Sequence, residues 1–258
     1  MTSTSTRDAR LIGLLIALAI VAWLITGDRM QGMDAGPGTD LGGLGWFAGV
    51  WVVMMAAMMF PSIGPMVLMD SRIRADKRER GAAVGTALFT AGYLVAWTAA
   101  GVLAYAVFEG LRSLDIGFLA WDDGGRFAAA GVLLAAALYQ LTSLKDAYLS
   151  ECRAPLAFVR HVWRPGAVGA VRMGIAHGAR CIGCCWALMA ALFALGVMSL
   201  AWMAVIAAMI AIEKLLPWKG VATRGVMAVL LVLAIAVAVS PESVPGLTLP
   251  DSAMDAMG

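Results

Sequence analysis

The sequence predicts an all-α, polytopic transmembrane helix bundle, and three observations lead to this fold class. Of the 258 residues, 61% are hydrophobic and only 14% are charged, and the mean hydropathy is +0.84. Soluble domains are closer to half apolar and a quarter charged, so the composition argues against an ordinary soluble fold. Several apolar stretches reach the roughly 17–25 residues that a helix needs to cross a bilayer. The basic residues are also distributed unevenly between the segments that connect these stretches.

Seven stretches have the length of a membrane span. They lie at residues 10–26, 46–69, 82–108, 126–143, 181–198, 199–216 and 221–239. The first is expected to be a retained helix, because no clear small-residue cleavage site follows it. The fifth and sixth form one apolar run in which only "LGVMSL" at 195–200 offers a turn. If that run were a single helix, the count would fall to six.

The basic residues predict the orientation of the chain. If the N-terminus is cytoplasmic and there are seven spans, 16 of the 19 Lys and Arg residues fall on the cytoplasmic side. The other three are Arg29, Arg112 and Arg126. This asymmetry follows the positive-inside rule and predicts a multi-pass protein of the bacterial inner membrane with its N-terminus inside and its C-terminus outside. Because the asymmetry explains the small net charge of +2, no nucleic-acid partner is expected.

The chain is expected to form one integral membrane domain over residues 1–258. Its one sizeable loop is predicted at 144–180, on the cytoplasmic side, with a short amphipathic helix at 154–166 along the membrane surface. None of the predicted spans carries Asp, Glu, Lys or His at its middle, which argues against a proton pump or a transporter of hard cations. Two histidines in all are too few for a His-rich zinc or di-iron site.

Three of the four cysteines lie within five positions, in "CIGCC" at 181–185. On a helix, the spacings of four and three place His177, Cys181 and Cys184 on one face, and Cys185 flanks them. Thiolate and imidazole groups are ligands for Cu(I) and zinc. Cysteine is also a small apolar residue that packs well in helix interiors, and spacing alone leaves the two interpretations equally supported. Free thiols are expected, because the cytoplasm is reducing.

Methionines form a second candidate site, in "WVVMMAAMMFPSIGPM" at 51–66. Met54 and Met58 are one turn apart, and their thioethers are soft, neutral ligands that favour Cu(I). The alternative, that they fill apolar gaps, is favoured by the sequence taken alone. Pro61 is expected on the same face and should kink or break the helix, because proline lacks an N–H group and clashes with the preceding turn.

The cytoplasmic end of the fourth span carries further candidates. Cys152 is placed to complete a thiolate site with Cys181 and Cys184. Lys145, Asp146 and Glu213 are expected at the same membrane level, where they either line a pocket or anchor the helices at the interface.

The motifs resemble a bacterial family of predicted metal-binding integral membrane proteins. The matching pieces are "GWFAGVWVVMMAAMMFPS" (45–62), "YQLTSLK" with "CRAP" (139–155), "HGARCIGCCWALMAALF" (177–193) and "IEKLLP" (212–217). Members of that family often carry a further Cys four residues before the position of Cys152, where this chain has Tyr148. The resemblance implies a membrane protein that binds a metal ion.

The leading hypothesis is an inner-membrane protein that binds, delivers or transports a soft metal. That metal is most simply Cu(I), with zinc as the alternative, and the partners are the lipid bilayer and a metal-donor or metal-acceptor protein. No catalytic residues are predicted. Two other classes stay open: a membrane thiol oxidoreductase that uses the vicinal cysteines, and a non-catalytic assembly subunit of a membrane complex.

Overall fold

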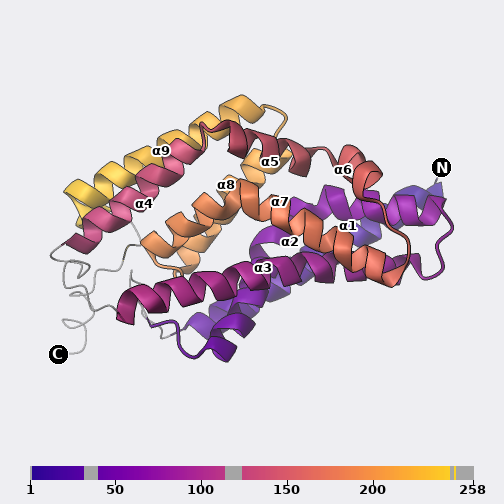
Figure 1. Ribbon diagram of the computed structural model, residues 1–258, viewed down its shortest axis with the longest axis horizontal. Coiled ribbons are helices and arrows are strands. Elements are labelled where there is room, and N and C mark those ends of the chain that lie inside the picture. Colours follow the sequence, from indigo (N-terminus) through magenta and orange to yellow (C-terminus); the bar gives the residue numbers. More distant parts are fainter. Residues whose placement is uncertain (1, 32–39, 114–123, 245–246, 248–258) are drawn as a thin grey trace. The chain divides into compact units, whose positions relative to one another are not determined.

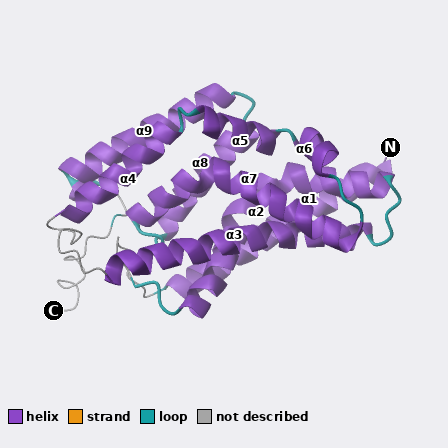
Figure 2. Cartoon of the chain, viewed as in Figure 1, coloured by secondary structure: helices purple, strands orange, loops and turns teal. Residues whose placement is uncertain are grey.

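The described part of the chain is helical throughout. The computed structural model describes residues 2–31, 40–113, 124–244 and 247, and within them no β-strand occurs (Figure 2). The α-helices are α1 (Thr2–Met30), α2 (Leu44–Asp76), α3 (Ala82–Ser113), α4 (Arg126–Tyr139), α5 (Ser143–Arg153), α6 (Pro155–Val162), α7 (Gly166–Leu195), α8 (Leu200–Leu215) and α9 (Lys219–Val239) (Figure 1). The prediction of an all-α protein is therefore confirmed.

Five of these helices are long and apolar enough to cross a membrane, namely α1, α2, α3, α7 and α9. The pair α4 and α5 meets the same test when taken together, although the two helices are bent by 67° at the break between them. The structure thus supports five or six candidate spans. Helix α8 has 16 residues and is not among these candidate spans.

The turn predicted between the fifth and sixth spans is present. Helix α7 ends at Leu195 and α8 begins at Leu200. Gly196 has φ +106°, a backbone conformation that residues other than glycine rarely adopt. The Ser199 hydroxyl accepts a hydrogen bond from the backbone N–H of Trp202 at 3.4 Å and so caps the start of α8.

The segment predicted as a loop at 144–180 is largely helical. It contains most of α5, all of α6 and the first half of α7. In α6, Phe158 and Val159 are buried, whereas Arg160 and His161 are exposed, so the predicted amphipathic helix is confirmed. The α7 helix begins at Gly166, well before the predicted start at 181. The polar residues in its first half lower the local hydropathy, and the predicted span therefore began too late. They do not interrupt the backbone hydrogen bonding of the helix.

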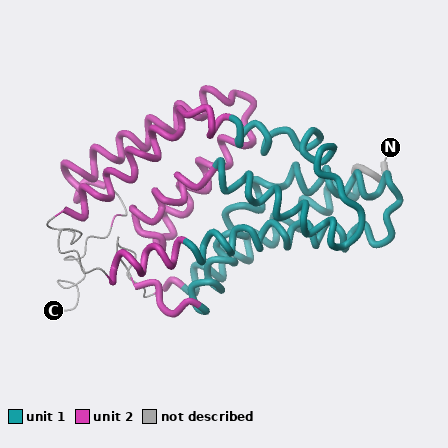
Figure 3. The backbone as a smooth tube through the Cα atoms, in the orientation of Figure 1, with its two compact units in different colours: residues 1–29, 45–103, 147–184 teal, residues 30–44, 104–146, 185–258 magenta. Residues whose placement is uncertain are grey.

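Two compact units divide the described chain (Figure 3). Unit 1 consists of residues 1–29, 45–103 and 147–184, and unit 2 consists of residues 30–44, 104–146 and 185–258. In unit 2, α4 packs along α9. Unit 1 holds α1, α2 and α6 together with parts of α3, α5 and α7.

In unit 1, helices α3 and α7 approach each other closely through glycines. A Cβ atom at Gly174 would lie 2.0 Å from the carbonyl oxygen of Phe89, and one at Gly92 would lie 2.3 Å from that of Val171. A Cβ atom at Gly178 would lie 2.6 Å from the Cβ of Ala96. Gly174 and Gly178 are four residues apart, the spacing that lets the backbones of two membrane helices come into contact.

This close approach predicts the effect of enlarging one glycine. Gly174→Ala is expected to destabilise the protein by about 1–3 kcal/mol, because the rigid backbone of α3 cannot yield to the new methyl group. Gly110→Ala, in the partner helix α3, is the control, since a Cβ atom there has no neighbour within 4 Å. Thermal unfolding in detergent measures both variants. Equal melting temperatures for the two would contradict the close packing of α3 and α7.

The Met-rich helix α2 is continuous from Leu44 to Asp76 and passes through both prolines. The helix is therefore not broken at Pro61, and the predicted kink there stays a prediction. Met54 and Met58 are buried, but Pro61 is exposed. Pro61 lies about 10 Å further along the helix than Met54. The pocket expected beside Pro61 stays a prediction.

Candidate metal centre

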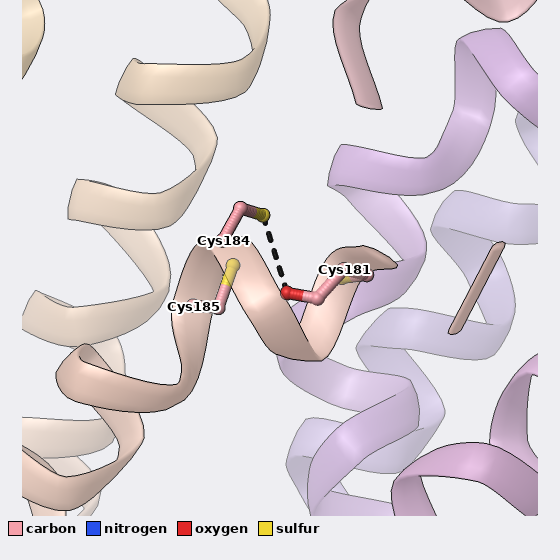
Figure 4. A group of neighbouring side chains, drawn as sticks. All are labelled: Cys181, Cys184 and Cys185. Atoms are coloured by element: carbon pink, nitrogen blue, oxygen red, sulfur yellow. Dashed lines mark hydrogen bonds between the residues drawn. The ribbon is translucent and has the colours of Figure 1, made fainter. Parts of the chain in front are cut away.

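Three thiols converge on one turn of α7. Cys181, Cys184 and Cys185 have relative exposures of 0%, 1% and 1%, and their Sγ atoms all lie within 4.8 Å of one another (Figure 4). The spacings of three and four residues produce this grouping, because they return the chain to the same side of the helix. We call these three residues the thiol triad. The prediction that this face of the helix is turned to the protein interior is confirmed.

The separation of the sulfur atoms suits a single metal ion. In a planar three-coordinate site with metal–sulfur bonds of about 2.3 Å, the sulfur atoms are about 4.0 Å apart. Atoms that already lie within 4.8 Å of one another need to move by less than about 1 Å to reach that arrangement. Rotation about the Cα–Cβ bond is sufficient for such a movement, so the triad can hold an ion without rearranging the helix.

A fourth thiol lies beside the triad. The Sγ atom of Cys152, near the end of α5, is 3.7 Å from that of Cys184. Cys152 is partly exposed, whereas the triad is buried. All four cysteines lie in the described part of the chain, and none forms a disulfide. The sequence prediction that Cys152 approaches this cluster is therefore supported by the distance to Cys184.

Two contacts just before Cys152 hold helix α5 against α7. The ring of Tyr148 fills the space over Gly183, where a Cβ atom would lie 2.7 Å from the ring. Glu151 forms an ion pair with Arg180. A larger residue at Gly183 would push α5 outward and carry Cys152 away from Cys184. The aromatic ring at 148 therefore has a packing role here.

Hydrogen bonds orient two of the triad thiols. The Cys184 thiol donates to the backbone carbonyl of Cys181 at 3.2 Å, as Figure 4 shows. The Cys181 sulfur is 3.1 Å from the hydroxyl of Tyr93, which is also buried. When Cys181 loses its proton to bind a metal, the hydroxyl becomes the donor and stabilises the thiolate. Three thiolates with one Cu(I) would carry a double negative charge, so such donors matter in a buried site.

His177 is buried one turn before the triad, among aromatic rings. Its ring lies 6.0 Å from that of Phe89, 5.7 Å from that of Tyr93 and 5.2 Å from that of Phe158, measured between centroids. Among the described residues, the ligand atoms that gather within 4.8 Å of one another are the three Sγ atoms of the triad, without an imidazole nitrogen of His177. The structure thus places His177 near the thiols but not among them.

The other predicted site residues lie in ion pairs of unit 2. Lys145 and Glu213 are both 1% exposed, and their charged groups are 2.7 Å apart. Asp146 pairs with Lys219 at 2.5 Å on the exposed side of α5. A buried ion pair of this kind needs both partners, because either charge alone would be strongly disfavoured away from water. These contacts fix the first turn of α5 in unit 2.

Sequence reasoning missed a second buried charge cluster, in unit 1. Asp70 and Arg74 are fully buried, and the guanidinium Nε is 2.9 Å from the carboxylate. Thr86 donates to the same carboxylate at 2.9 Å, and Arg74 also pairs with Glu79 at 2.8 Å. The spacing of four residues in α2 was the available signal. The partners in α3 are not visible from the sequence, and neither is Tyr93 beside Cys181.

Comparisons with known proteins place the chain in a family. A family model described as PpoB2, copper chaperone, matches residues 48–237, well over half of the chain and including the thiol triad. No curated protein and no solved structure matches. The matched region contains the Met-rich part of α2, the whole of α3 to α8 and the three buried thiols whose spacing suits Cu(I). The chain belongs to the PpoB2 copper chaperone family.

Proposed function

We propose that the protein binds one Cu(I) ion through Cys181, Cys184 and Cys185, and passes it to or from a partner protein without catalysing a reaction. The grouping of three buried Sγ atoms within 4.8 Å carries this proposal. Thiolates are soft ligands and suit Cu(I). Cys152 serves as the thiol through which the ion enters or leaves, because it is partly exposed and lies 3.7 Å from Cys184.

Coordination number distinguishes Cu(I) from zinc in this proposal. The buried triad offers three sulfur ligands on one helical turn. This ligand set suits Cu(I), because Cu(I) prefers soft ligands such as thiolates. A structural zinc site is almost always tetrahedral and would need Cys152 as a permanent fourth ligand. The partial exposure of Cys152 favours a transient role and therefore favours Cu(I).

The remaining predicted ligands have supporting roles in the proposal. Met54 and Met58 are buried in α2 and offer thioethers to an ion that moves through the protein interior. His177 orients the aromatic residues around Tyr93 and does not coordinate the resting ion. The residues Lys145, Asp146 and Glu213 act as structural ion pairs that hold α5 in place.

We also propose seven spans in the bacterial inner membrane, with the N-terminus inside. This count adds α8 and the bent pair α4 and α5 to the five long helices, and the distribution of basic residues supports it. A reporter that fluoresces only in the cytoplasm, fused after Gly258, should then stay dark. A bright signal would contradict this orientation.

Metal analysis of the purified full-length protein tests the function. Loaded with Cu(I) under reducing conditions and desalted against a competing chelator, the protein should retain about one copper per chain, because soft thiolates hold Cu(I) tightly. Zinc loaded in the same way should be removed by the chelator.

The same preparation distinguishes the thiol oxidoreductase alternative, which the short distance between Cys152 and Cys184 favours. An oxidoreductase would reduce a quinone or a partner disulfide with turnover and would retain no copper. An assembly subunit would show neither property. Either result would contradict the proposed function.

A further inference from the structure

An open pocket lies next to the cysteines but contains none of them. It has a volume of about 440 Å³ and is lined by residues of α5, α6 and α7, including Glu151, Phe158, His161 and Arg180. Its size falls within the range of small-molecule sites, roughly 300–1,000 Å³. We call it the head-group pocket. All of its lining residues belong to unit 1.

The charges of the head-group pocket are arranged to bind a carboxylate. The Arg180 guanidinium stacks over the Phe158 ring, 4.9 Å from its centroid, so its plane is fixed. Its Nε bonds to Glu151 and one terminal nitrogen donates to the Ala176 carbonyl at 2.9 Å. A guanidinium has five N–H groups, and those that remain form a planar fork that matches a carboxylate.

A carboxylate and an imidazole are also present in the pocket. The Glu151 side chain is 51% exposed and can accept hydrogen bonds from an ammonium group. The Nδ1 atom of His161 is 2.8 Å from the Ala157 carbonyl, which makes Nδ1 the donor in the neutral ring and leaves Nε2 as an acceptor. A ligand with a carboxylate and an ammonium group, the head group of an amino acid, matches these partners.

The position of the pocket connects it to the thiols. Glu151 directly precedes Cys152, and Arg180 directly precedes Cys181. The triad itself is buried, whereas Cys152 is partly exposed, so among the four described cysteines Cys152 is the one most accessible to a carrier in solution. A ligand held by its head group in this pocket would thus bring a thiolate of its own to the neighbourhood of Cys152.

We infer that the head-group pocket binds a small thiol of amino-acid or peptide type that carries Cu(I), and that the ion is exchanged there with Cys152. This inference rests on the proposed function. In the exchange, the bond between copper and the carrier's sulfur breaks and a bond between copper and the Cys152 sulfur forms. The proton of the Cys152 thiol goes to the departing thiolate, and copper stays in the +1 state throughout. Cys184, 3.7 Å away, then accepts the ion for the triad.

The test compares two copper donors on the full-length protein in lipid nanodiscs. Cu(I)–glutathione carries carboxylates and an ammonium group, whereas Cu(I)–dithiothreitol carries neither. Transfer is followed by rapid desalting and metal analysis at timed intervals. Arg180→Gln is expected to slow transfer from the glutathione complex at least about tenfold, which corresponds to the loss of a charge-assisted hydrogen-bonded pair. Transfer from the dithiothreitol complex should change by less than about twofold, since that donor has no group for Arg180 to bind.

Two controls keep the test decisive. Arg160→Gln removes the same charge from an exposed position on α6 that does not line the pocket, and it should affect neither donor. On the unaltered protein, S-methylglutathione keeps the head groups but has no free thiol, so it should slow transfer from the glutathione complex alone. Because the S-methylglutathione measurement uses the unaltered protein, it tests the pocket even if Arg180→Gln fails to fold.

The outcomes separate this inference from the proposed function. The head-group pocket is not a carrier site if Arg180→Gln slows copper transfer from both donors equally or from neither, and if S-methylglutathione does not compete. Copper binding by the triad would be unaffected by that result. If the unaltered protein takes copper from neither donor, the proposed function fails and this inference fails with it.

Discussion

Replacing Cys181 and Cys184 together by serine is expected to abolish copper binding. The hydroxyl group keeps the size of the side chain but exchanges a soft ligand for a hard one. Only Cys185 would remain of the triad, and one buried sulfur cannot retain Cu(I) against a chelator. The copper content of the purified protein should fall from about one per chain to less than about a tenth. Metal analysis after desalting measures this change, and the yield of folded protein should be unaffected.

Graded variants show whether the loss is specific to the triad. Cys152→Ser should leave the final copper content near that of the unaltered protein but slow loading, because Cys152 is the partly exposed thiol. Met54→Leu with Met58→Leu preserves apolar packing and should weaken copper acquisition less than the double serine variant does. If the double serine variant retained its copper, the three cysteines would be packing residues only.

The second large effect concerns the buried charges of α2. Arg74→Met is expected to destabilise the protein by about 3–5 kcal/mol, because it leaves the Asp70 carboxylate buried without its cation. Both side chains are completely buried, and Thr86 alone cannot replace the lost pairing. The free energy of unfolding in detergent or lipid measures the effect.

Another arginine of the same helix, paired with a residue of α1, provides the matched control. Arg72 pairs with Asp8 at 2.6 Å, but the Arg72 side chain is 49% exposed. Arg72→Met should therefore cost less than about 1 kcal/mol. Removing both buried charges with Arg74→Met and Asp70→Leu should recover part of the loss. If Arg74→Met cost no more than Arg72→Met, the Asp70 and Arg74 pair would not have the structural role assigned to it.

The sequence predicted those features that depend on spacing within one helix. The triad follows from positions three and four apart, and the all-α membrane fold follows from long apolar stretches. Tyr93 could not be predicted, because its contact with Cys181 depends on how α3 packs against α7 through Gly174 and Gly178. That contact joins residues 88 positions apart.

The differences between the predicted and observed helix limits, and the surroundings of Pro61 and His177, have similar physical causes. The first half of α7 carries Arg172, His177 and Arg180, which lower its hydropathy and made it resemble a loop. Pro61 shares a helical face with Met54 in an ideal helix. Whether a side chain on that face is buried depends on which other segments pack against it at that position along the helix. His177 has the right spacing for a ligand, and the aromatic residues of α3 and α6 that surround it come from other segments.

X-ray absorption at the copper edge of the Cu(I)-loaded, full-length protein identifies the atoms that bind the metal. Binding by the thiol triad should give an edge typical of Cu(I) and a first shell of three sulfur atoms at about 2.3 Å. Replacing Cys185 by serine should remove one sulfur atom from this first shell, whereas Cys152→Ser should remove none. A first shell composed mainly of nitrogen or oxygen, or a sulfur shell that the Cys185→Ser replacement leaves unchanged, would contradict copper binding by the thiol triad.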